Sequence, residues 1–338
     1  MNEDILHVRA QLAPHDPAAQ LTDEAIDAAK SRTRVRLAAK PGAAARPVRR
    51  RTIVSVAVTG VLALAGTAVA TGLLPLPGTT AGQSYGATPH LLESTPMPSD
   101  NTLAGVLTGI ADRVEQLPDA SAADARYDYV RTRSWDLWTA VRERTATSAI
   151  VVQDREVWLA ADGSGRLRTA SVEDGSAPTA SDRAAGEDSV LGAGVLSVPD
   201  QKWSTDPAVL ATQLDRGHPA AAGPSERLVA VADVYRSQHI APQLRAALLR
   251  VLAESPELQL DGTTTDRAGR TGVAISATTG TGLPRRHTLV FDPATGSLLD
   301  AEQILTSDPG KLNITVPAVV SYQLFLASGR VPTTDDRP

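Results

Sequence analysis

The stretch REVWLAADGSGRLR, residues 155–168, contains the pattern that decides the fold. Residues 156–160 include the branched and aromatic side chains that favour β-strands. The next residues, Asp162-Gly163-Ser164-Gly165, are typical of a tight hairpin turn, because glycine accepts the positive φ angles that such turns require. Residues 166–168 then lead into a second strand. The stretch therefore predicts two neighbouring antiparallel strands.

Further strand patterns lie on both sides of this hairpin. Before it, residues 127–133 alternate in strand fashion, and residues 148–152 form a run rich in branched side chains. After it, strands are predicted at residues 258–260, 272–276, 286–291, 298–305 and about 314–325. The turn DPATG, residues 292–296, joins two of these strands, since proline fixes φ and glycine accepts a positive φ.

Helical patterns separate the strands into two groups. Apolar residues at three- and four-residue steps predict a helix up to Leu117 that Asp100 caps. Three more helices are predicted: one capped by Thr205 or Asp206 with Pro207 at its first position, one at 226–238 capped by Ser225, and one at 243–254 opened by Pro242. Strands, a helical block and strands again indicate the α+β class with an antiparallel sheet, not a parallel βαβ array.

Several of these segments resemble a family of single-pass membrane proteins from actinobacteria that has no established activity. The resembling segments are residues 155–168, 204–214 (STDPAVLATQL), 241–254 (APQLRAALLRVLAE), 265–275 (TDRAGRTGVAI), 290–299 (VFDPATGSLL) and 4–17 (DILHVRAQLAPHDP). The resemblance implies one membrane span and an outer domain similar to the LolA-like lipoprotein carriers. In such a domain a curved antiparallel sheet, a half-barrel, wraps over helices. The resemblance implies no functional residues.

Residues 52–74, TIVSVAVTGVLALAGTAVATGLL, contain no charged side chain. A helix of this length spans about 34 Å, enough to cross the hydrocarbon core of a membrane. A buried core helix would carry a polar face, which this stretch lacks. The alternative is a secretion signal cleaved after Ala70, but the 51 residues ahead of the apolar run exceed the usual length of such a signal. We therefore expect a permanent transmembrane helix.

The charges that flank this helix predict its orientation. Residues 1–51 contain ten basic and six acidic side chains, a net charge of +4, whereas the rest of the chain carries a net charge of −9. Arg49, Arg50 and Arg51 stand at the membrane boundary. Because cytoplasmic flanks retain Lys and Arg, we expect a cell-membrane protein with a cytoplasmic N-terminus and an extracytoplasmic C-terminal domain. Membrane lipid is then its first partner.

These features divide the chain into five parts. The predicted parts are a basic helical cytoplasmic segment (1–51), the transmembrane helix (52–74), a spacer rich in Pro, Gly, Ser and Thr (75–98), an extracytoplasmic α+β domain (99–330) and a tail (331–338). The α+β domain is long enough to bury one sizeable core.

The residues that carry chemistry form no catalytic or metal-binding pattern. The chain has no cysteine, which excludes thiol catalysis, disulfides and cysteine zinc sites. Residues 82–86 match the G-x-S-x-G serine motif, but they lie in the spacer without the strand and helix that the motif needs. The six histidines are scattered, without metal-binding spacing. We therefore expect no enzyme, no catalytic or metal residues and no cofactor, and the binding residues stay unassigned.

The aromatic side chains are few, and six of them gather mainly around the first strands. They are Tyr127, Tyr129, Trp135, Trp138, Trp158 and Trp203. One interpretation is that they line a pocket for an apolar ligand. The other, which we favour, is that they pack in the core against the helices, because large aromatic side chains dominate protein cores.

Three functions are compatible with these patterns. The leading hypothesis is a non-enzymatic single-pass membrane protein whose outer domain binds an apolar ligand or an envelope protein. In the alternative, residues 1–40 bind a cytoplasmic sigma factor and the outer domain is a sensor, although the zinc-type anti-sigma domains use cysteines that this chain lacks. An envelope hydrolase is the second alternative.

Nucleic acid is not an expected partner, since residues 1–51 contain no aromatic side chain. The ligand and the oligomeric state stay open.

Overall fold

A computed structural model of the chain describes residues 88–119, 124–142, 145–172, 186–196, 202–279, 282–310, 312 and 314–338, without the side chains of residues 139–147. All of them belong to one compact unit, residues 64–338. The predicted cytoplasmic segment, the transmembrane helix at 52–74, and Arg49, Arg50 and Arg51 lie outside the described residues. Within them, no helix has the length and apolar character needed to cross a bilayer.

The described residues form one ten-stranded sheet. Its strands are β1 (Ser94–Thr95), β2 (Tyr127–Arg142), β3 (Thr145–Ala160), β4 (Gly165–Ser171), β5 (Asp188–Leu191), β6 (Gln259–Thr265), β7 (Thr271–Thr278), β8 (Arg285–Phe291), β9 (Leu298–Leu305) and β10 (Ala318–Val331). Their order in the sheet is β1-β6-β7-β8-β9-β10-β2-β3-β4-β5, and every neighbouring pair is antiparallel. The last strand, β10, therefore joins the two halves of the sheet.

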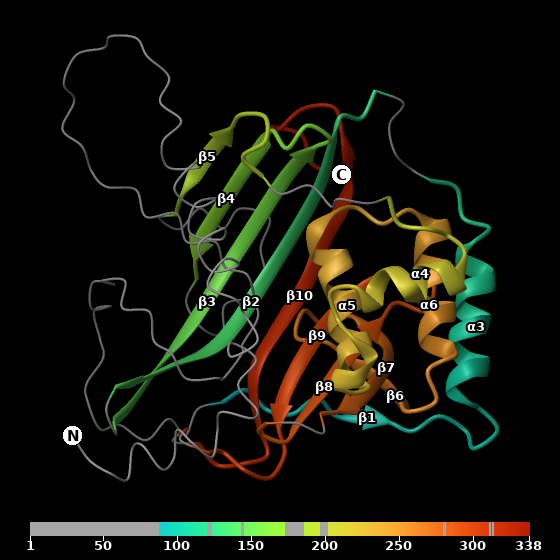
Figure 1. Cartoon of the computed structure of the whole chain (residues 1–338), viewed down its shortest axis with the longest axis vertical. Helices are drawn as coiled ribbons and strands as arrows, with labels where there is room; N and C mark the ends of the chain where they lie inside the picture. Colours follow the sequence, from blue (N-terminus) through green and yellow to red (C-terminus); the bar gives the residue numbers. More distant parts are fainter. Residues whose placement is uncertain are drawn as a thin grey trace, which may run out of the picture. The chain divides into compact units, whose positions relative to one another are not determined.

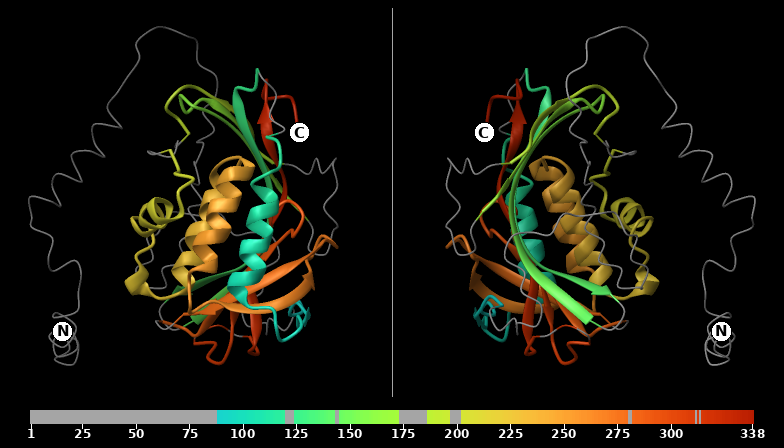
Figure 2. Two further views of the ribbon diagram at one scale, coloured as in Figure 1. Left: turned by 90° about the vertical axis from the view of Figure 1, so that its right-hand side faces the viewer. Right: turned by 90° about the vertical axis from the view of Figure 1, so that its left-hand side faces the viewer.

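Four α-helices accompany the sheet in the described part of the chain. They are α3 (Leu103–Val114), α4 (Pro207–Asp215), α5 (Ser225–Ser237) and α6 (Pro242–Ala253), with a short 3₁₀ helix, η3 (Ala220–Ala222), before α5. The sheet curves around them and its edge strands β1 and β5 do not meet (Figures 1 and 2). The predicted α+β class, with an open, curved antiparallel sheet packed on helices, is confirmed.

The hairpin predicted at residues 155–168 forms between β3 and β4. Gly163 has a φ of 75°, which places it in the left-handed region that glycine tolerates. The Asp162 carboxylate accepts hydrogen bonds from the backbone N–H of Ser164 at 2.9 Å and from its hydroxyl at 2.6 Å. Register then follows: Leu159 lies opposite Gly165, and Val157 lies opposite Leu167.

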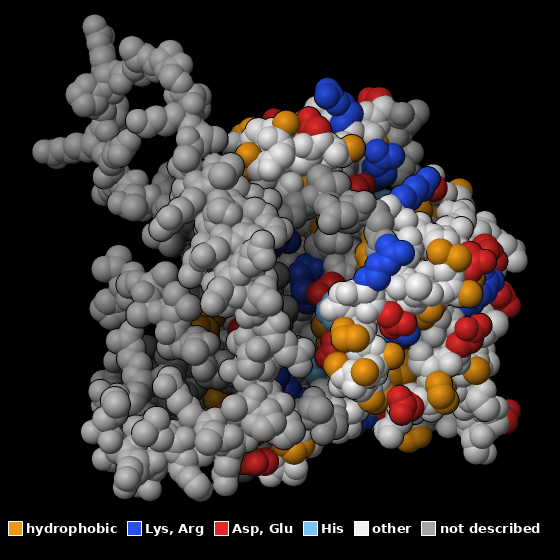
Figure 3. Space-filling view, viewed as in Figure 1, with side chains coloured by type: hydrophobic (Ala, Val, Ile, Leu, Met, Phe, Trp, Pro, Cys, Tyr) orange, Lys and Arg blue, Asp and Glu red, His pale blue; other side chains and the backbone are white. Residues whose placement is uncertain are grey.

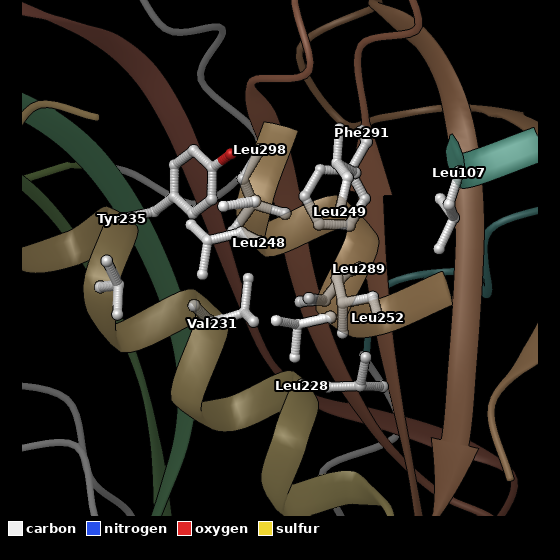
Figure 4. Packing of buried hydrophobic residues seen from close by; sticks show 14 of the residues in the cluster. Leu107, Leu228, Val231, Tyr235, Leu248, Leu249, Leu252, Leu289, Phe291 and Leu298 are labelled. Atoms are coloured by element: carbon white, nitrogen blue, oxygen red, sulfur yellow. The ribbon is translucent and has the colours of Figure 1, made fainter. Parts of the chain in front are cut away.

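The main core lies between the helices and one face of the sheet. Leu248 and Leu249 of α6 are fully buried, and Val231 of α5 is buried with them. They meet Leu289 and Phe291, which alternate along β8 and so point to the same face (Figure 4). Each such side chain contributes roughly 1.5–3 kcal/mol through burial. The space between α5, α6 and β8 is thus filled by packed side chains.

Of two N-cap residues predicted from the sequence, one is confirmed and one is wrong. Asp206 caps α4 as predicted, and its carboxylate accepts the Val209 backbone N–H at 3.0 Å. The cap predicted at Asp100 is wrong, because α3 begins later. Its cap is Thr102, whose hydroxyl accepts the Gly105 backbone N–H at 3.1 Å. Both residues suit a helix start chemically, so composition alone did not separate them.

Candidate functional site

A cleft of about 850 Å³ opens where β10 runs past the end of β9. Its lining comes from segments that are distant in sequence: the residues after α3, part of β2, the α5–α6 junction, the β6–β7 turn, the β8–β9 turn, the second half of β10 and the C-terminal residues. The lining residues include Tyr235, His239, Arg245, Arg270, Ser297, Phe325, Ser328, Gly329, Arg330, Asp336, Arg337 and Pro338. Three protein walls and a strand edge therefore surround one space.

The strand edge results from unequal strand lengths. β10 pairs with β9 only over residues 318–324, whereas it pairs with β2 as far as Val331. Beyond Leu324, no described strand covers the side of β10 that faced β9. Backbone N–H and C=O groups alternate between the two sides of a strand. Because the Val331 carbonyl accepts the Arg126 backbone N–H on the β2 side, the backbone groups of Ser328 and Arg330 face the open side.

Arg270 marks the point where the β9–β10 ladder ends. Its guanidinium donates hydrogen bonds to the Phe325 carbonyl at 2.6 Å and to the Leu299 carbonyl at 2.8 Å. The same group donates to the Asp266 carboxylate at 2.7 Å, which holds it in place. The side chain thus bridges the two strands where they separate, and the open edge of β10 begins after it.

The helical wall carries a cation that has no carboxylate partner among the described residues. Arg245, in the first turn of α6, donates a hydrogen bond to the Ser297 hydroxyl at 2.7 Å, and its buried Nε has no partner. Burial lowers the pKa of Arg245. Beside it, His239 Nδ1 lies 3.2 Å from the Ser328 hydroxyl of β10. Burial first, and then the charge of Arg245, lower the pKa of His239, so the ring is neutral at pH 7.

The C-terminal residues form the wall on the opposite face of the sheet. The Trp158 indole N–H donates to the Asp336 carbonyl at 2.8 Å, and the guanidinium of Arg337 lies 5.2 Å from the Trp158 ring centre. Arg337 also pairs with Glu156 at 2.6 Å. Gly329 permits the close approach of the chain end, since a Cβ there would lie 2.6 Å from the Pro338 side chain.

The six aromatic residues singled out from the sequence do not line this cleft. Trp135 and Trp158 are fully buried, but on the face of the sheet opposite the helices, where they pack against Tyr322 and Tyr129 respectively. The prediction that Trp135 and Trp158 pack against the helices is therefore wrong. Trp203 packs partly buried against the helical core, whereas Trp138 is 47% exposed.

The histidines singled out from the sequence do not come together in the described residues. No three His, Cys, Asp or Glu side chains there are placed to hold a metal ion. His90, His218, His239 and His287 lie on separate elements, while His7, His15 and the serine motif at 82–86 lie outside the described residues.

A buried carboxyl pair lies on the helix-free face of β9. Burial raises the pKa of Asp300 well above its usual value and also raises that of Glu302. Glu302 receives one hydrogen bond from Arg267 at 2.7 Å and borders a smaller cavity of about 230 Å³. Both carboxyl oxygens of Asp300 are buried, and neither has a hydrogen-bond partner among the described residues.

No protein-family model matches the chain, and no curated protein matches it. Among solved structures, the chain is similar to a chain of the Pseudomonas aeruginosa MucA/MucB complex, with 15% identity, a TM-score of 0.27, and coverage of 69% of this chain and 59% of that one. MucB in complex with MucA(peri) gives 16% identity, a TM-score of 0.27, and coverage of 69% and 58%. For MucB alone, the sequence identity is 14% and the TM-score is 0.26, with coverage of 72% of this chain and 62% of that one.

The chain therefore spans about three-fifths of the length of the chains it matches. Similarity at this level does not extend to function. Membership in the actinobacterial family and the LolA-like character of the domain stay predictions from the sequence.

Sequence reasoning did not find the cleft. The predicted final strand ended near Phe325, whereas β10 continues to Val331. The signal was present in residues 326–331, LASGRV, which carry the strand on past the length of β9. Local patterns could not predict that β10 pairs with both β9 and β2. Without this pairing, the open edge cannot be assigned to any strand.

Proposed function

We propose that the chain is a non-enzymatic, membrane-anchored protein whose C-terminal domain binds a polypeptide partner as an added strand along β10. The observation that carries this proposal is the open edge of β10, which forms one wall of the cleft. Such an edge presents unpaired N–H and C=O groups at the spacing of another strand. An extended segment entering the cleft would pair with Ser328 and Arg330.

The lining of the cleft favours a polypeptide over an apolar ligand. Pockets for apolar small molecules are lined mainly by hydrophobic side chains with few polar groups. Here Arg245, Arg270, Arg330 and Arg337 all contribute to the walls, and the strand edge adds backbone groups that need hydrogen-bond partners. Of the two ligands expected from the sequence, an apolar molecule or an envelope protein, the second therefore has more support.

The helical surface offers less support for docking than the cleft. Over the helices in Figure 3, hydrophobic side chains are scattered among acidic and basic ones. Stable partner sites on such surfaces usually have an apolar centre. The proposal therefore assigns recognition to the strand edge and its surroundings.

The membrane anchor at 52–74 and the outside location of the domain belong to the same proposal. They are supported by the uncharged stretch and by the cationic flank that ends in Arg49, Arg50 and Arg51. Protease added to intact spheroplasts should digest the C-terminal domain. A domain that is spared under these conditions would remove this part of the proposal.

A signalling role is the second candidate, because the chain combines a short inner segment, one predicted span and a large outer domain. In that case residues 1–40 bind a sigma factor and the cleft receives the signal. A pull-down with the full chain that recovers no sigma factor would argue against it.

Substitution at Ser328 tests strand addition. In Ser328→Pro, the N–H that faces the open side is lost, while pairing with β2 on the other side is retained. Ser328→Ala keeps the N–H and loses only the hydroxyl that contacts His239. A phage-displayed library of random decapeptides should yield enriched sequences on the full wild-type chain and on Ser328→Ala, but not on Ser328→Pro.

Circular dichroism and thermal unfolding of the three proteins provide the control for folding. Equal enrichment on a folded Ser328→Pro protein would contradict strand addition. The absence of any enriched sequence on the wild-type chain would contradict the proposed function as a whole.

A further inference from the structure

We propose that the partner strand carries an acidic side chain, Asp or Glu, which pairs with Arg245. This inference rests on the proposed function and specifies which polypeptides the cleft accepts. Its starting point is the position of Arg245 in the first turn of α6, on the wall that faces β10.

Arg245 is a partly buried charge whose guanidinium, among the described residues, makes a hydrogen bond only to the Ser297 hydroxyl. A neutral hydroxyl compensates little of the cost of removing a guanidinium from water, and the buried Nε has no partner at all. Proteins usually pair such a cation with a carboxylate. No salt bridge joins Arg245 to any described carboxylate, although Asp119 and Asp292 act on it from a distance.

The other arginines of the cleft already have carboxylate partners. Arg270 pairs with Asp266 at 2.5 Å, and Arg337 pairs with Glu156 at 2.6 Å. Arg330 lies 3.4 Å from Asp128. These three arginines are paired within the protein. Arg245, in contrast, has no carboxylate partner among the described residues, so its charge can pair with a ligand.

The acidic residues of the cleft do not fill this role. The Asp292 carboxylate accepts the Ala294 backbone N–H at 2.8 Å and the Thr295 hydroxyl at 2.7 Å, as part of its own turn. Asp336 accepts the hydroxyl of Thr333 within the C-terminal residues. Asp119 makes interactions of its own. An external carboxylate therefore supplies what Arg245 lacks.

His239 connects Arg245 to the strand edge. Its ring contacts the Ser328 hydroxyl of β10, and His239, Ser328 and Arg245 all line the same cleft. An added strand that pairs at Ser328 therefore passes next to His239, within reach of Arg245 for a long acidic side chain. A guanidinium binds a carboxylate through two parallel hydrogen bonds, which makes the contact selective for acidic residues.

The test compares the decapeptides enriched on the full wild-type chain with those enriched on Arg245→Gln and Arg245→Lys. Wild-type sequences should share an Asp or Glu at one position. Replacement of that residue by Asn or Gln should raise the Kd for wild type about 10- to 100-fold, the value of a charge-assisted hydrogen-bonded pair. The same replacement should hardly change the Kd for Arg245→Gln, and Arg245→Lys should fall between the two.

His239 supplies a second measurement. A bound carboxylate would offset the charge of Arg245, so an acidic peptide should raise the pKa of His239 in NMR titration relative to its neutral counterpart. The groups that act on this ring besides Arg245 are Asp119 and Arg330, and both are present in each comparison.

Two outcomes separate this inference from the proposed function. Enriched peptides without an acidic position, lost on Ser328→Pro, would overturn the pairing with Arg245 and leave strand addition in place. Enrichment that is the same on wild type and on Arg245→Gln would also overturn it. A library without enriched peptides would overturn both.

Discussion

At the scale of single residues, the helix-free face of the sheet is held by buried charges. The Arg133 guanidinium donates to both oxygens of Asp154, at 2.5 and 3.0 Å, and both side chains are almost fully buried. Such a pair satisfies its own charges. Asp300 does not have this compensation, because both of its oxygens are buried without a partner. Its neutral form is therefore the one that the fold accepts.

The pKa of Asp300 predicts how stability depends on pH. Burial raises this pKa in the folded protein, so as pH increases above about 4 the unfolded chain ionises first and is stabilised. Folding stability should therefore fall as pH rises, by up to about 1.4 kcal/mol per pH unit for one such carboxyl. Asp300→Asn removes this group and should reduce the decline.

Urea unfolding at pH 5 and pH 8 measures the effect. Asp100→Asn provides a matched control, because it makes the same chemical change at an exposed carboxyl. Glu302, Asp266 and Arg267 act on Asp300 and remain in both variants. An Asp300→Asn protein with the same pH dependence as wild type would contradict the neutral state of this carboxyl.

At the scale of elements, local patterns predicted most strands and helices. Pro207 and Pro242 open α4 and α6, and Gly163 turns the β3–β4 hairpin, each through a backbone preference that the sequence alone carries. Lengths were harder to predict. β2 and β3 each extend over 16 residues, because their long mutual register supports stretches whose own patterns are weak.

Two segments join the fold through contacts that are distant in sequence. Residues 94 and 95, within the stretch predicted as a spacer, pair with β6 as the short strand β1. The residues after β10 lie over Trp158 and contribute to the cleft. Neither contact leaves a local signal, since the partners are more than 160 positions away.

Removal of residues 332–338 should expose Trp158. The deletion takes away the Asp336 carbonyl that accepts the indole N–H and the Arg337 guanidinium that lies over the ring. Tryptophan emission should shift to longer wavelength, and acrylamide should quench it more strongly. The same deletion in a Trp158→Phe background should show neither change. Unchanged quenching in the wild-type background would contradict this placement of the C-terminal residues.

At the scale of the whole molecule, the order of the strands creates the site. Because β10 lies between β9 and β2, it connects the two halves of the sheet, and the shorter β9 leaves the second half of β10 open. The α+β class with an antiparallel sheet could be predicted from the alternation of strand and helix patterns, whereas the curvature of the sheet was implied only by the resemblance to the actinobacterial family. The order of the strands could not, because long-range pairing depends on packing across the whole sheet.

The central claim is that an extended polypeptide pairs with the open edge of β10. Amide hydrogen exchange, resolved by NMR in the full chain, tests it most directly. With a bound decapeptide from the library, the amides of Ser328 and Arg330 should exchange much more slowly than in the free protein, because each gains a backbone partner. A peptide that binds at saturation while these two amides exchange at the free rate would contradict the claim.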